Sequence, residues 1–246
     1  MEVPDAIFDD PRLARVYDPL DPDRRDLDLY DAIAMEIGAA SVLDVGCGTG
    51  TFACQLALRG VEVIGVDPAR ASLDVAASKA GADRVRWIHG DATALPPLQV
   101  DAAFMTANVA QVFLTDDEWL ATLHCIRTAL RPGGILVFEA RDPARRAWES
   151  WTRAATFVSV GVADIGVVES WKQVGVVDGE LVNFRSMTNF VDEGVLLEST
   201  STLRFRERPA LEASLLACGF ELTDVRDAAD RPGREFVFLG RRPHQD

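Results

Sequence analysis

Positive charge is scarce in this sequence of 246 residues, and lysine is almost absent. Arginine and lysine together number 25 against 39 aspartates and glutamates, which gives a formal net charge of −14. A protein that binds nucleic acid needs a basic face for the phosphates, and attraction to an anionic membrane surface needs one too. We therefore expect no nucleic acid and no membrane among the partners. The only lysines are Lys79 and Lys172.

Cysteine, histidine and long apolar runs are also few. No pair of the four cysteines has zinc-ligand spacing and no secretory signal is evident, so we expect reduced thiols, no metal site and a cytoplasmic location. The apolar runs are far shorter than the roughly 20 residues of a membrane span. No histidine is placed in sequence to serve as a base, either for catalysis or for Cys47 as a nucleophile. The cysteines are Cys47, Cys54, Cys125 and Cys218, and the histidines are His89, His124 and His244.

Apolar residues make up 48% of the chain, enough for a sizeable core, and they fall in alternating strand and helix patterns up to residue 142. Such alternation, with strands that are apolar throughout, predicts a doubly wound parallel sheet covered on both faces. Ligands of these sheets bind at the carboxyl ends of the strands. We predict strands at 41–45, 61–66, 85–89, 100–106 and 135–139, with helices at 23–37, 51–59, 69–80 and 116–129.

The pattern changes after residue 142. We predict a short helix at 143–153 and then an antiparallel β-meander, with strands at 167–176, 181–190 and 195–206. A helix at 209–218 and strands at 220–225 and 235–241 return to the main sheet. The predicted organisation is an N-terminal segment 1–40, an α/β core 41–142, an insertion 143–208 and a C-terminal segment 209–246. The stretch from residue 131 to 134 is predicted as a hard turn because it reads Arg-Pro-Gly-Gly.

The most informative stretch is a glycine-rich turn between a predicted strand and a predicted helix. Gly46, Gly48 and Gly50 lack Cβ atoms where the backbone must turn sharply and lie against a ligand, and Asp44 precedes them. In the dinucleotide fingerprint G-x-G-x-x-G the third glycine would fall at position 51, which is a threonine. The spacing therefore counts against a nicotinamide cofactor and favours a polar, zwitterionic nucleoside.

This turn resembles the first motif of the class I S-adenosylmethionine-dependent methyltransferases, of the type that acts on small molecules. The resemblance continues over residues 12–142, at an acid after the second strand, at Gly90-Asp91-Ala92, at Asn108-Val109-Ala110-Gln111 and at Tyr17-Asp18. It implies a Rossmann-like seven-stranded sheet whose last strand is antiparallel. It also implies S-adenosylmethionine as cofactor, with S-adenosylhomocysteine as product, and an N-terminal lid over it.

The resemblance implies a role for each matching position. Asp44 would hold the cofactor's ammonium group, and the turn would give backbone contacts. Asp67 would accept the ribose hydroxyls, Asp91 with Ala92 would meet the adenine, and Asn108 with Val109 would lie beside the methyl group. Tyr17 would close over the sulfonium, and Arg24 or Arg25 would meet the carboxylate. The cofactor-binding positions are Tyr17, Arg25, Asp44, Gly46, Cys47, Gly48, Asp67, Pro68, Asp91, Ala92, Asn108 and Val109.

Methyl transfer from a sulfonium is an in-line displacement, so positioning supplies much of the catalysis and the enzyme needs no nucleophile. We name Asn108 and Glu139 as catalytic candidates, the first through its carbonyl oxygen and the second, or Glu169, as a weak base. The acceptor pocket is expected between the sheet edge and the meander, which is also a candidate homodimer surface. Aromatic side chains and arginines there suggest a planar or anionic small molecule. The pocket candidates are Glu139, Arg141, Trp148, Trp151, Trp171, Arg185 and Arg204.

The expected activity is therefore methyl transfer to nitrogen or oxygen of a small-molecule acceptor. Two alternatives stay open. One is a non-catalytic protein that binds S-adenosylmethionine or serves as a scaffold. The other is a nicotinamide-dependent oxidoreductase on a similar sheet, which Thr51 disfavours. The alternative interpretation of the tryptophans is that they pack in the core or at an interface.

Overall fold

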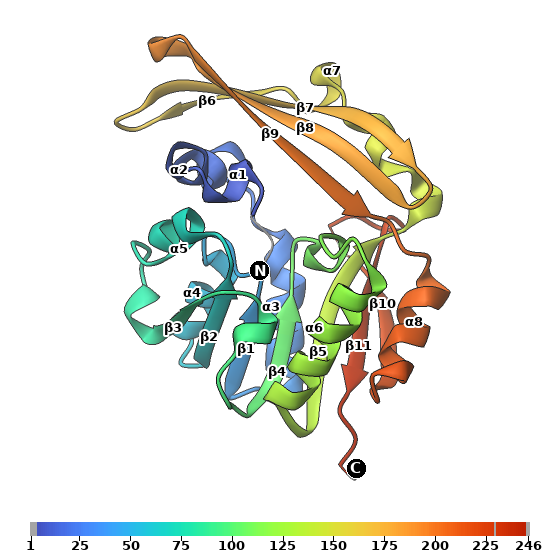
Figure 1. Ribbon diagram of the computed structural model, residues 1–246. Coiled ribbons are helices and arrows are strands. Elements are labelled where there is room, and N and C mark those ends of the chain that lie inside the picture. The colour runs from blue at the N-terminus through green and yellow to red at the C-terminus, as the bar shows by residue number, and fades with distance from the viewer. Residues whose placement is uncertain (1–3, 229, 245–246) are drawn as a thin grey trace.

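The computed structural model describes residues 4–228 and 230–244, which form two separate β-sheets (Figure 1). The larger sheet has seven strands in the order β10-β11-β5-β4-β1-β2-β3. Only β11 runs antiparallel to its neighbours, and the other pairs are parallel. This confirms the predicted fold class. The strands are β1 (Ser41–Val45), β2 (Glu62–Asp67), β3 (Val85–His89), β4 (Val100–Met105), β5 (Leu130–Arg141), β10 (Glu221–Asp227) and β11 (Glu235–Arg241).

Helices cover both faces of this sheet because successive strand residues point to opposite sides. Val42 belongs to the apolar cluster under α3 and α4, whereas its neighbour Leu43 belongs to the cluster under α6 and α8. Helix α6 begins with a reciprocal cap in which Thr115 and Glu118 bond each other's backbone amides. The covering helices are α3 (Asp26–Ile37), α4 (Thr51–Leu58), α5 (Arg70–Ala76), α6 (Asp116–Ala129) and α8 (Arg208–Ala217).

The predicted hard turn at residues 131–134 is wrong, because β5 begins before it. Val100 of β4 pairs with Leu130, and Ala102 pairs with Ile135, so the four residues between bulge out of a continuous strand. Gly133 takes a φ of +84° in this bulge. Its amide donates a hydrogen bond to the Arg242 carbonyl at 2.8 Å, which ties the bulge to the end of the chain.

The smaller sheet is an antiparallel meander of four strands in the order β6-β7-β8-β9, one more than predicted. The single helix expected at 143–153 is wrong. Two short 3-10 turns and one helical turn occupy this region, because Asp142 caps the first and Arg146 takes a positive φ of 44°. The elements are Pro143–Arg145, Ala147–Ser150, α7 (Arg153–Thr156), β6 (Val158–Val162), β7 (Gly166–Asp178), β8 (Leu181–Phe190) and β9 (Val195–Arg204).

Two N-terminal helices, α1 (Ala6–Asp9) and α2 (Pro11–Leu20), lie between the two sheets (Figure 1). Asp10 caps α2 by accepting hydrogen bonds from two backbone amides, and Pro11 follows it, where the missing N–H costs nothing. The Phe8 carbonyl accepts from Ser72 of α5 at 2.7 Å, and the Ile7 amide donates to Ser199 of β9 at 2.9 Å. Both sheets are therefore joined through this segment.

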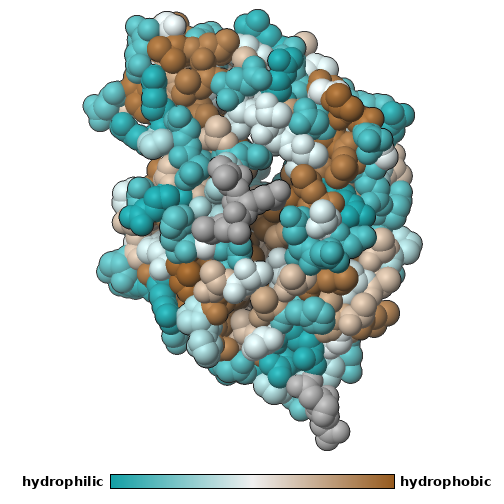
Figure 2. Space-filling view, viewed as in Figure 1, coloured by the Kyte–Doolittle hydropathy of each residue, from teal (hydrophilic) through white to brown (hydrophobic). Residues whose placement is uncertain are grey.

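Figure 2 shows an opening between the part of the surface formed by the four-stranded sheet and the part formed by the α/β layers. Among residues 4–228 and 230–244, no helix has the length and apolar character required to cross a membrane.

Candidate active site

The glycine turn joins β1 to α4, and its three glycines have different neighbours. All three take positive φ angles, of 68° at Gly46, 52° at Gly48 and 75° at Gly50. A Cβ on Gly48 would meet no atom within 4 Å, so open space lies against this residue. A Cβ on Gly50 would lie 2.5 Å from Trp87 and 2.7 Å from Ala76. Gly50 therefore allows α4 to start close against β3 and α5, whereas Gly48 faces space that a ligand can fill.

The missing side chain of Gly46 makes room for another loop of the protein, which corrects the expectation that all three glycines leave space for a ligand. A Cβ there would lie 2.6 Å from the Val109 side chain. The loop after β4 is thereby pressed against the turn after β1. Because neighbouring parallel strands end at the same edge of the sheet, this contact brings Asn108 and Val109 next to the glycine turn.

Asp44, in the same strand as the turn, is a buried carboxylate with an unsatisfied oxygen. Its side chain is 1% exposed, and Oδ1 has no hydrogen-bond partner among the described residues. Burial raises the pKa of this carboxyl to about 7, with a further increase from the charge of Asp67 and an opposing effect of Arg24. An unpaired buried carboxylate is costly, and a cationic group placed beside it would remove that cost.

Asp67 ends β2, and backbone amides hold its carboxylate. One oxygen accepts from the Gly48 amide at 2.7 Å and the other from the Ala69 amide at 2.8 Å. Burial raises its pKa, and these two hydrogen bonds oppose the increase. The carboxylate is thus fixed beside the open glycine, and each oxygen can accept further hydrogen bonds. The adjoining Pro68 carbonyl lies 3.0 Å from His89 Nε2.

Cys47 lies in the turn, but its thiol faces away from the open space. A Cβ built on Gly65 of β2 would lie 3.1 Å from its Sγ, so the side chain points toward the sheet. Burial, followed by the charges of Asp44 and Asp67, raises the pKa of the thiol well above its usual value. Cys47 can therefore offer only its backbone to a ligand, and the thiol is inert as a nucleophile.

Asp91 and Ala92 follow β3 at the same edge. The Asp91 carboxylate accepts from the amide and the hydroxyl of Thr93, and Ala92 is buried. Asp91 is partly exposed, so one side of its carboxylate remains accessible.

Asn108 is held in an unusual backbone conformation by Glu139. Ala107 and Asn108 have positive φ angles of 54° and 64°. Glu139 Oε1 accepts from the Asn108 amide at 2.8 Å and from its Nδ2 at 3.2 Å, and Oε2 accepts from the Tyr30 hydroxyl. Asn108 Oδ1 is buried with no partner among the described residues. The side-chain amide is therefore oriented by its nitrogen and leaves its oxygen free to accept.

Glu139 is 2% exposed, and burial raises its pKa, as does the neighbouring Glu235. Both of its oxygens already accept hydrogen bonds from Tyr30 and Asn108. This geometry gives Glu139 the role of a positioning residue under the Asn108 loop. Tyr30 was missing from the sequence prediction because it lies on a helix face that looks like ordinary core.

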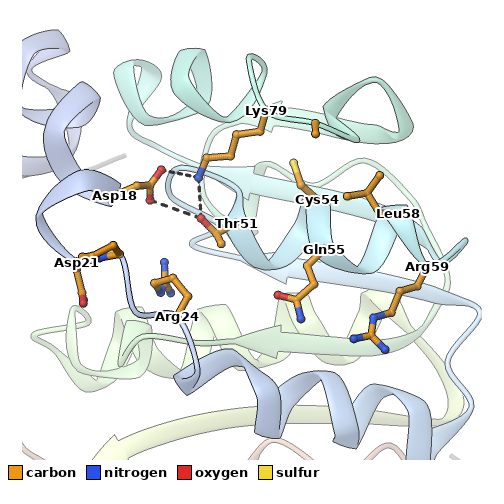
Figure 3. Close-up of a pocket in the computed structure, with 11 residues that line it drawn as sticks. Asp18, Asp21, Arg24, Thr51, Cys54, Gln55, Leu58, Arg59 and Lys79 are labelled. Carbon is orange, nitrogen blue, oxygen red and sulfur yellow. Dashed lines mark hydrogen bonds and ion pairs between the residues drawn. The ribbon is translucent and has the colours of Figure 1, made fainter. Parts of the chain in front are cut away.

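The N-terminal helices reach the glycine turn through Asp18. Its carboxylate accepts from Thr49 Oγ1 at 2.7 Å. It also pairs with Lys79 Nζ at 2.6 Å, and Lys79 donates to Thr51 Oγ1 at 2.6 Å (Figure 3). Asp18, Thr51 and Lys79 border an open pocket of about 630 Å³ beside α4. The neighbouring Tyr17 is half-buried, and the centre of its ring lies 5.8 Å from the centre of the Phe8 ring. Burial raises the pKa of its hydroxyl.

The two adjacent arginines of this segment are placed differently. Arg25 is exposed and pairs with Asp23 of its own segment at 2.5 Å. Arg24 is less exposed, pairs with Asp26 at 3.1 Å, and lowers the pKa of both Asp44 and Tyr17 through its charge. Of the pair that the sequence offered, Arg24 is the one near the site.

The residues proposed to line the acceptor pocket divide between the two faces of the meander. Trp171 and Arg185 lie on its outer face, because their cross-strand partners alternate with the buried residues of β8, and so does Glu169, the alternative candidate base. The predicted placement of Trp171 and Arg185 in the pocket was wrong, since period-2 alternation puts them on the far side. Arg204 is bound to Glu180 and Asp116. The rest of the set, Glu139, Arg141, Trp148 and Trp151, lies on the side of the α/β core.

Comparison with known proteins adds to this geometry. Residues 42–134 match the family described as a methyltransferase domain. This segment is therefore similar to a methyltransferase domain. It contains the glycine turn, both buried aspartates, Asp91 and the Asn108 loop.

Relatives that match about half of this chain or less are described by different activities. A cypemycin N-terminal methyltransferase from a Streptomyces species is 35% identical over 108 residues, which is 42% of this chain and 43% of that protein. A biotin biosynthesis bifunctional protein, BioHC of Cellvibrio japonicus, is 31% identical over 49% of this chain and 24% of its own length. The chain thus spans less than half the length of these two relatives.

Solved structures resemble nearly the whole chain. The CcbJ methyltransferase of Streptomyces caelestis has a TM-score of 0.70 at 25% identity and covers 90% of each chain. A methyltransferase from Clostridium acetobutylicum has a TM-score of 0.74 at 16% identity over 94% of this chain and 98% of its own, which shows the shared fold alone. Among residues 4–228 and 230–244, no group of three or more His, Cys, Asp or Glu side chains could hold a metal ion.

Proposed function

We propose that this protein transfers a methyl group from S-adenosylmethionine to a nitrogen or oxygen atom of a small-molecule acceptor. One observation carries the proposal: the buried Asp44 carboxylate has an unpaired oxygen near an open glycine turn, inside a methyltransferase domain. A zwitterionic nucleoside with an ammonium group fits this site, because it would neutralise the carboxylate and occupy the space at Gly48.

The residues present divide the work of binding. Asp44 would hold the ammonium group, Asp67 the ribose hydroxyls, and the backbone at Gly46, Cys47 and Gly48 the rest of the amino-acid part. Asp91 and Ala92 would meet the adenine. When bound, S-adenosylmethionine supplies a methyl group on a positively charged sulfur.

The chain's own chemistry near the reacting group is positioning. Asn108 Oδ1 would accept a hydrogen bond from an N–H or O–H of the acceptor and hold its lone pair toward the methyl group, while Glu139 fixes the amide. An amine acceptor reacts through its lone pair and releases its proton afterwards, so it needs no base on the enzyme at the moment of attack.

Two measurements test this proposal. Calorimetry should detect binding of S-adenosylmethionine and S-adenosylhomocysteine but not of NAD, and Asp44→Ala should abolish it. Label from methyl-radiolabelled S-adenosylmethionine should then appear in one class within a panel of small amines, phenols, sugars and carboxylates. Tight cofactor binding with no transfer to any panel member would favour a non-catalytic binding protein.

A further inference from the structure

The inner face of the four-stranded sheet, which faces the α/β core, carries a single charged side chain. Register and alternation put the even-numbered residues of β8 on this face, together with their cross-strand partners on β7 and β9. Along β6 to β9 these are apolar residues, glycine, serines and a threonine, with Lys172 as the one exception. Lys172 lies opposite Ser186, which in turn lies opposite Ser199.

Lys172 lies within a polar band between two apolar clusters. One cluster joins Trp148, Trp151 and Phe184, and the other packs Phe190 against Leu13 of α2. Lys172 is exposed to solvent within this band, and its ammonium group forms no hydrogen bond or ion pair with the described residues. Water reaches the side chain, but the surrounding protein and the charge of Arg141 lower its pKa to about 8.

Arg141 approaches the same place from the core. It lies at the carboxyl end of β5, two residues after Glu139, and its guanidinium group lies 5.8 Å from the centre of the Trp151 ring. The Lys172 ammonium group lies 6.0 Å from the centre of the Phe184 ring, and these two rings are themselves 4.7 Å apart. One aromatic pair therefore carries a cation on each ring, one from each sheet. Asp21 and Arg231 act on Lys172 through their charges, and Glu235 pairs with Arg141 at 3.5 Å.

We infer that Lys172, assisted by Arg141, binds an anionic group of the methyl acceptor, so that the substrate is a small molecule bearing a carboxylate or a phosphate. This inference rests on the proposed function. A carboxylate or phosphate is the partner that an unpaired ammonium group beside a guanidinium group recognises, by charge-assisted hydrogen bonds. Because Lys172 and Arg141 meet near the end of β5, an anionic group bound there would anchor the acceptor while its reacting atom lies toward Asn108.

The scarcity of lysine permits a direct test. Protein labelled with ¹³C at lysine Cε should give two side-chain signals, from Lys79 and Lys172. Sodium benzoate, phenyl phosphate and neutral benzamide are added in turn, with and without S-adenosylhomocysteine. We expect benzoate or phenyl phosphate, but not benzamide, to move the Lys172 signal saturably and to raise its pKa from about 8 toward that of free lysine. The tighter of the two anions identifies the acidic group.

Lys79, already paired with Asp18, is the internal control and should not move. Lys172→Met should lose saturable binding of the anion in calorimetry. Arg185→Met, which removes one positive charge from the outer face of the same sheet, should keep it. The inference is overturned if neither anion moves Lys172, if both lysines move alike, or if Lys172→Met binds the anion as the parent protein does.

Calorimetry with S-adenosylhomocysteine on the same sample separates this inference from the proposed function. Cofactor binding without an anion response rejects the anion site alone. A sample that binds the anion at Lys172 but no cofactor rejects the methyltransferase proposal and leaves the anion site in place.

Discussion

The two sheets would contact a ligand through different parts of the chain. At the edge of the seven-stranded sheet, the contacts offered are backbone amides and carboxylates that lie within a few residues of strand ends, such as Asp44 and Asp67. On the four-stranded sheet they are side chains from the middle of several strands, among them Lys172 and Phe184. The first kind of site depends on where strands end. The second depends on which face each residue takes, and that depends on register.

The largest expected effect comes from a substitution that disrupts packing around the glycine turn of the seven-stranded sheet. Gly50→Val should lower the free energy of unfolding by about 3 kcal/mol or more, because its Cβ would overlap Trp87 and Ala76 at a positive φ. Gly48→Ala is the matched control, with no atom within 4 Å of its Cβ, and should lose only about 1–2 kcal/mol. Equal losses in urea titrations would show that Gly50 has no packing role.

Removal of the strand-end carboxylate should come next. Asp67→Ala should weaken S-adenosylmethionine binding by about 1–3 kcal/mol, the range for a lost buried hydrogen-bonding partner. Asp74→Ala removes the same charge from an exposed position on α5 and should bind normally in calorimetry. Parent-like affinity in Asp67→Ala would reject the assignment of the ribose to this residue.

The affinity for S-adenosylmethionine should depend on pH through the buried carboxyl of Asp44. The pKa of Asp44 is about 7 in the free protein, so affinity for S-adenosylmethionine should increase as pH rises from 6 to 8 and the carboxylate forms. Calorimetry in buffers of different ionisation enthalpy should detect proton release on binding. Affinity that is constant over this range would contradict the assignment of the ammonium group to Asp44.

The same group has the opposite effect on stability. Its pKa is raised on folding from 3.8 to about 7, so its stabilising contribution is complete below pH 4 and is lost as pH rises through 7. Asp44→Asn, which cannot ionise, should lack this loss and unfold at a higher temperature than the parent at pH 8. The difference between the two proteins isolates Asp44 from Glu139, whose pKa is also raised.

A smaller effect is expected at the contact between the N-terminal helices and the glycine turn. The Asp18–Lys79 pair is about a quarter exposed on each side, so a double-mutant cycle with Asp18→Asn and Lys79→Met should give a coupling of about 1 kcal/mol or less. The cofactor affinity should fall a few-fold and the effect should shrink in high salt. A coupling that salt does not change would argue against an ion pair.

The smallest effect should come from the four-stranded sheet. Thr188 is fully buried, and its hydroxyl oxygen has no partner among the described residues. Thr188→Val replaces the hydroxyl with a methyl group and should stabilise the fold by up to about 1 kcal/mol in thermal unfolding, with cofactor affinity unchanged. Destabilisation would show that this hydroxyl is satisfied in solution.

The comparison of the sheets also explains how much could be predicted from sequence. β1, β3, β8, β11 and α6 have the predicted bounds, because each is a short apolar or alternating run closed by a turn or a cap. The acids at the strand ends were found for the same reason. Their burial and hydrogen bonds were not, since these depend on neighbours far along the chain.

Other features could not be predicted because their signals are weak or non-local. Helix α2 has a Pro11 start and an Asp10 cap, but the acidic, proline-containing segment looked irregular. Strand β6 is short and contains glycine and serine. The sequence prediction named Trp171 as a pocket residue and did not name Lys172 beside it. The face of the sheet on which each residue lies depends on the strand register, which the sequence does not reveal.

The N-terminal helices have a consequence for protein engineering. They bond to α5 through Phe8 and to β9 through Ile7, so they belong to neither sheet alone. A chimera that exchanges only residues 158–204 with a homologue would leave these helices facing a foreign strand. Acceptor preference should therefore transfer between relatives only when the first 20 residues travel with the four-stranded sheet, although the two segments are more than a hundred residues apart in the chain.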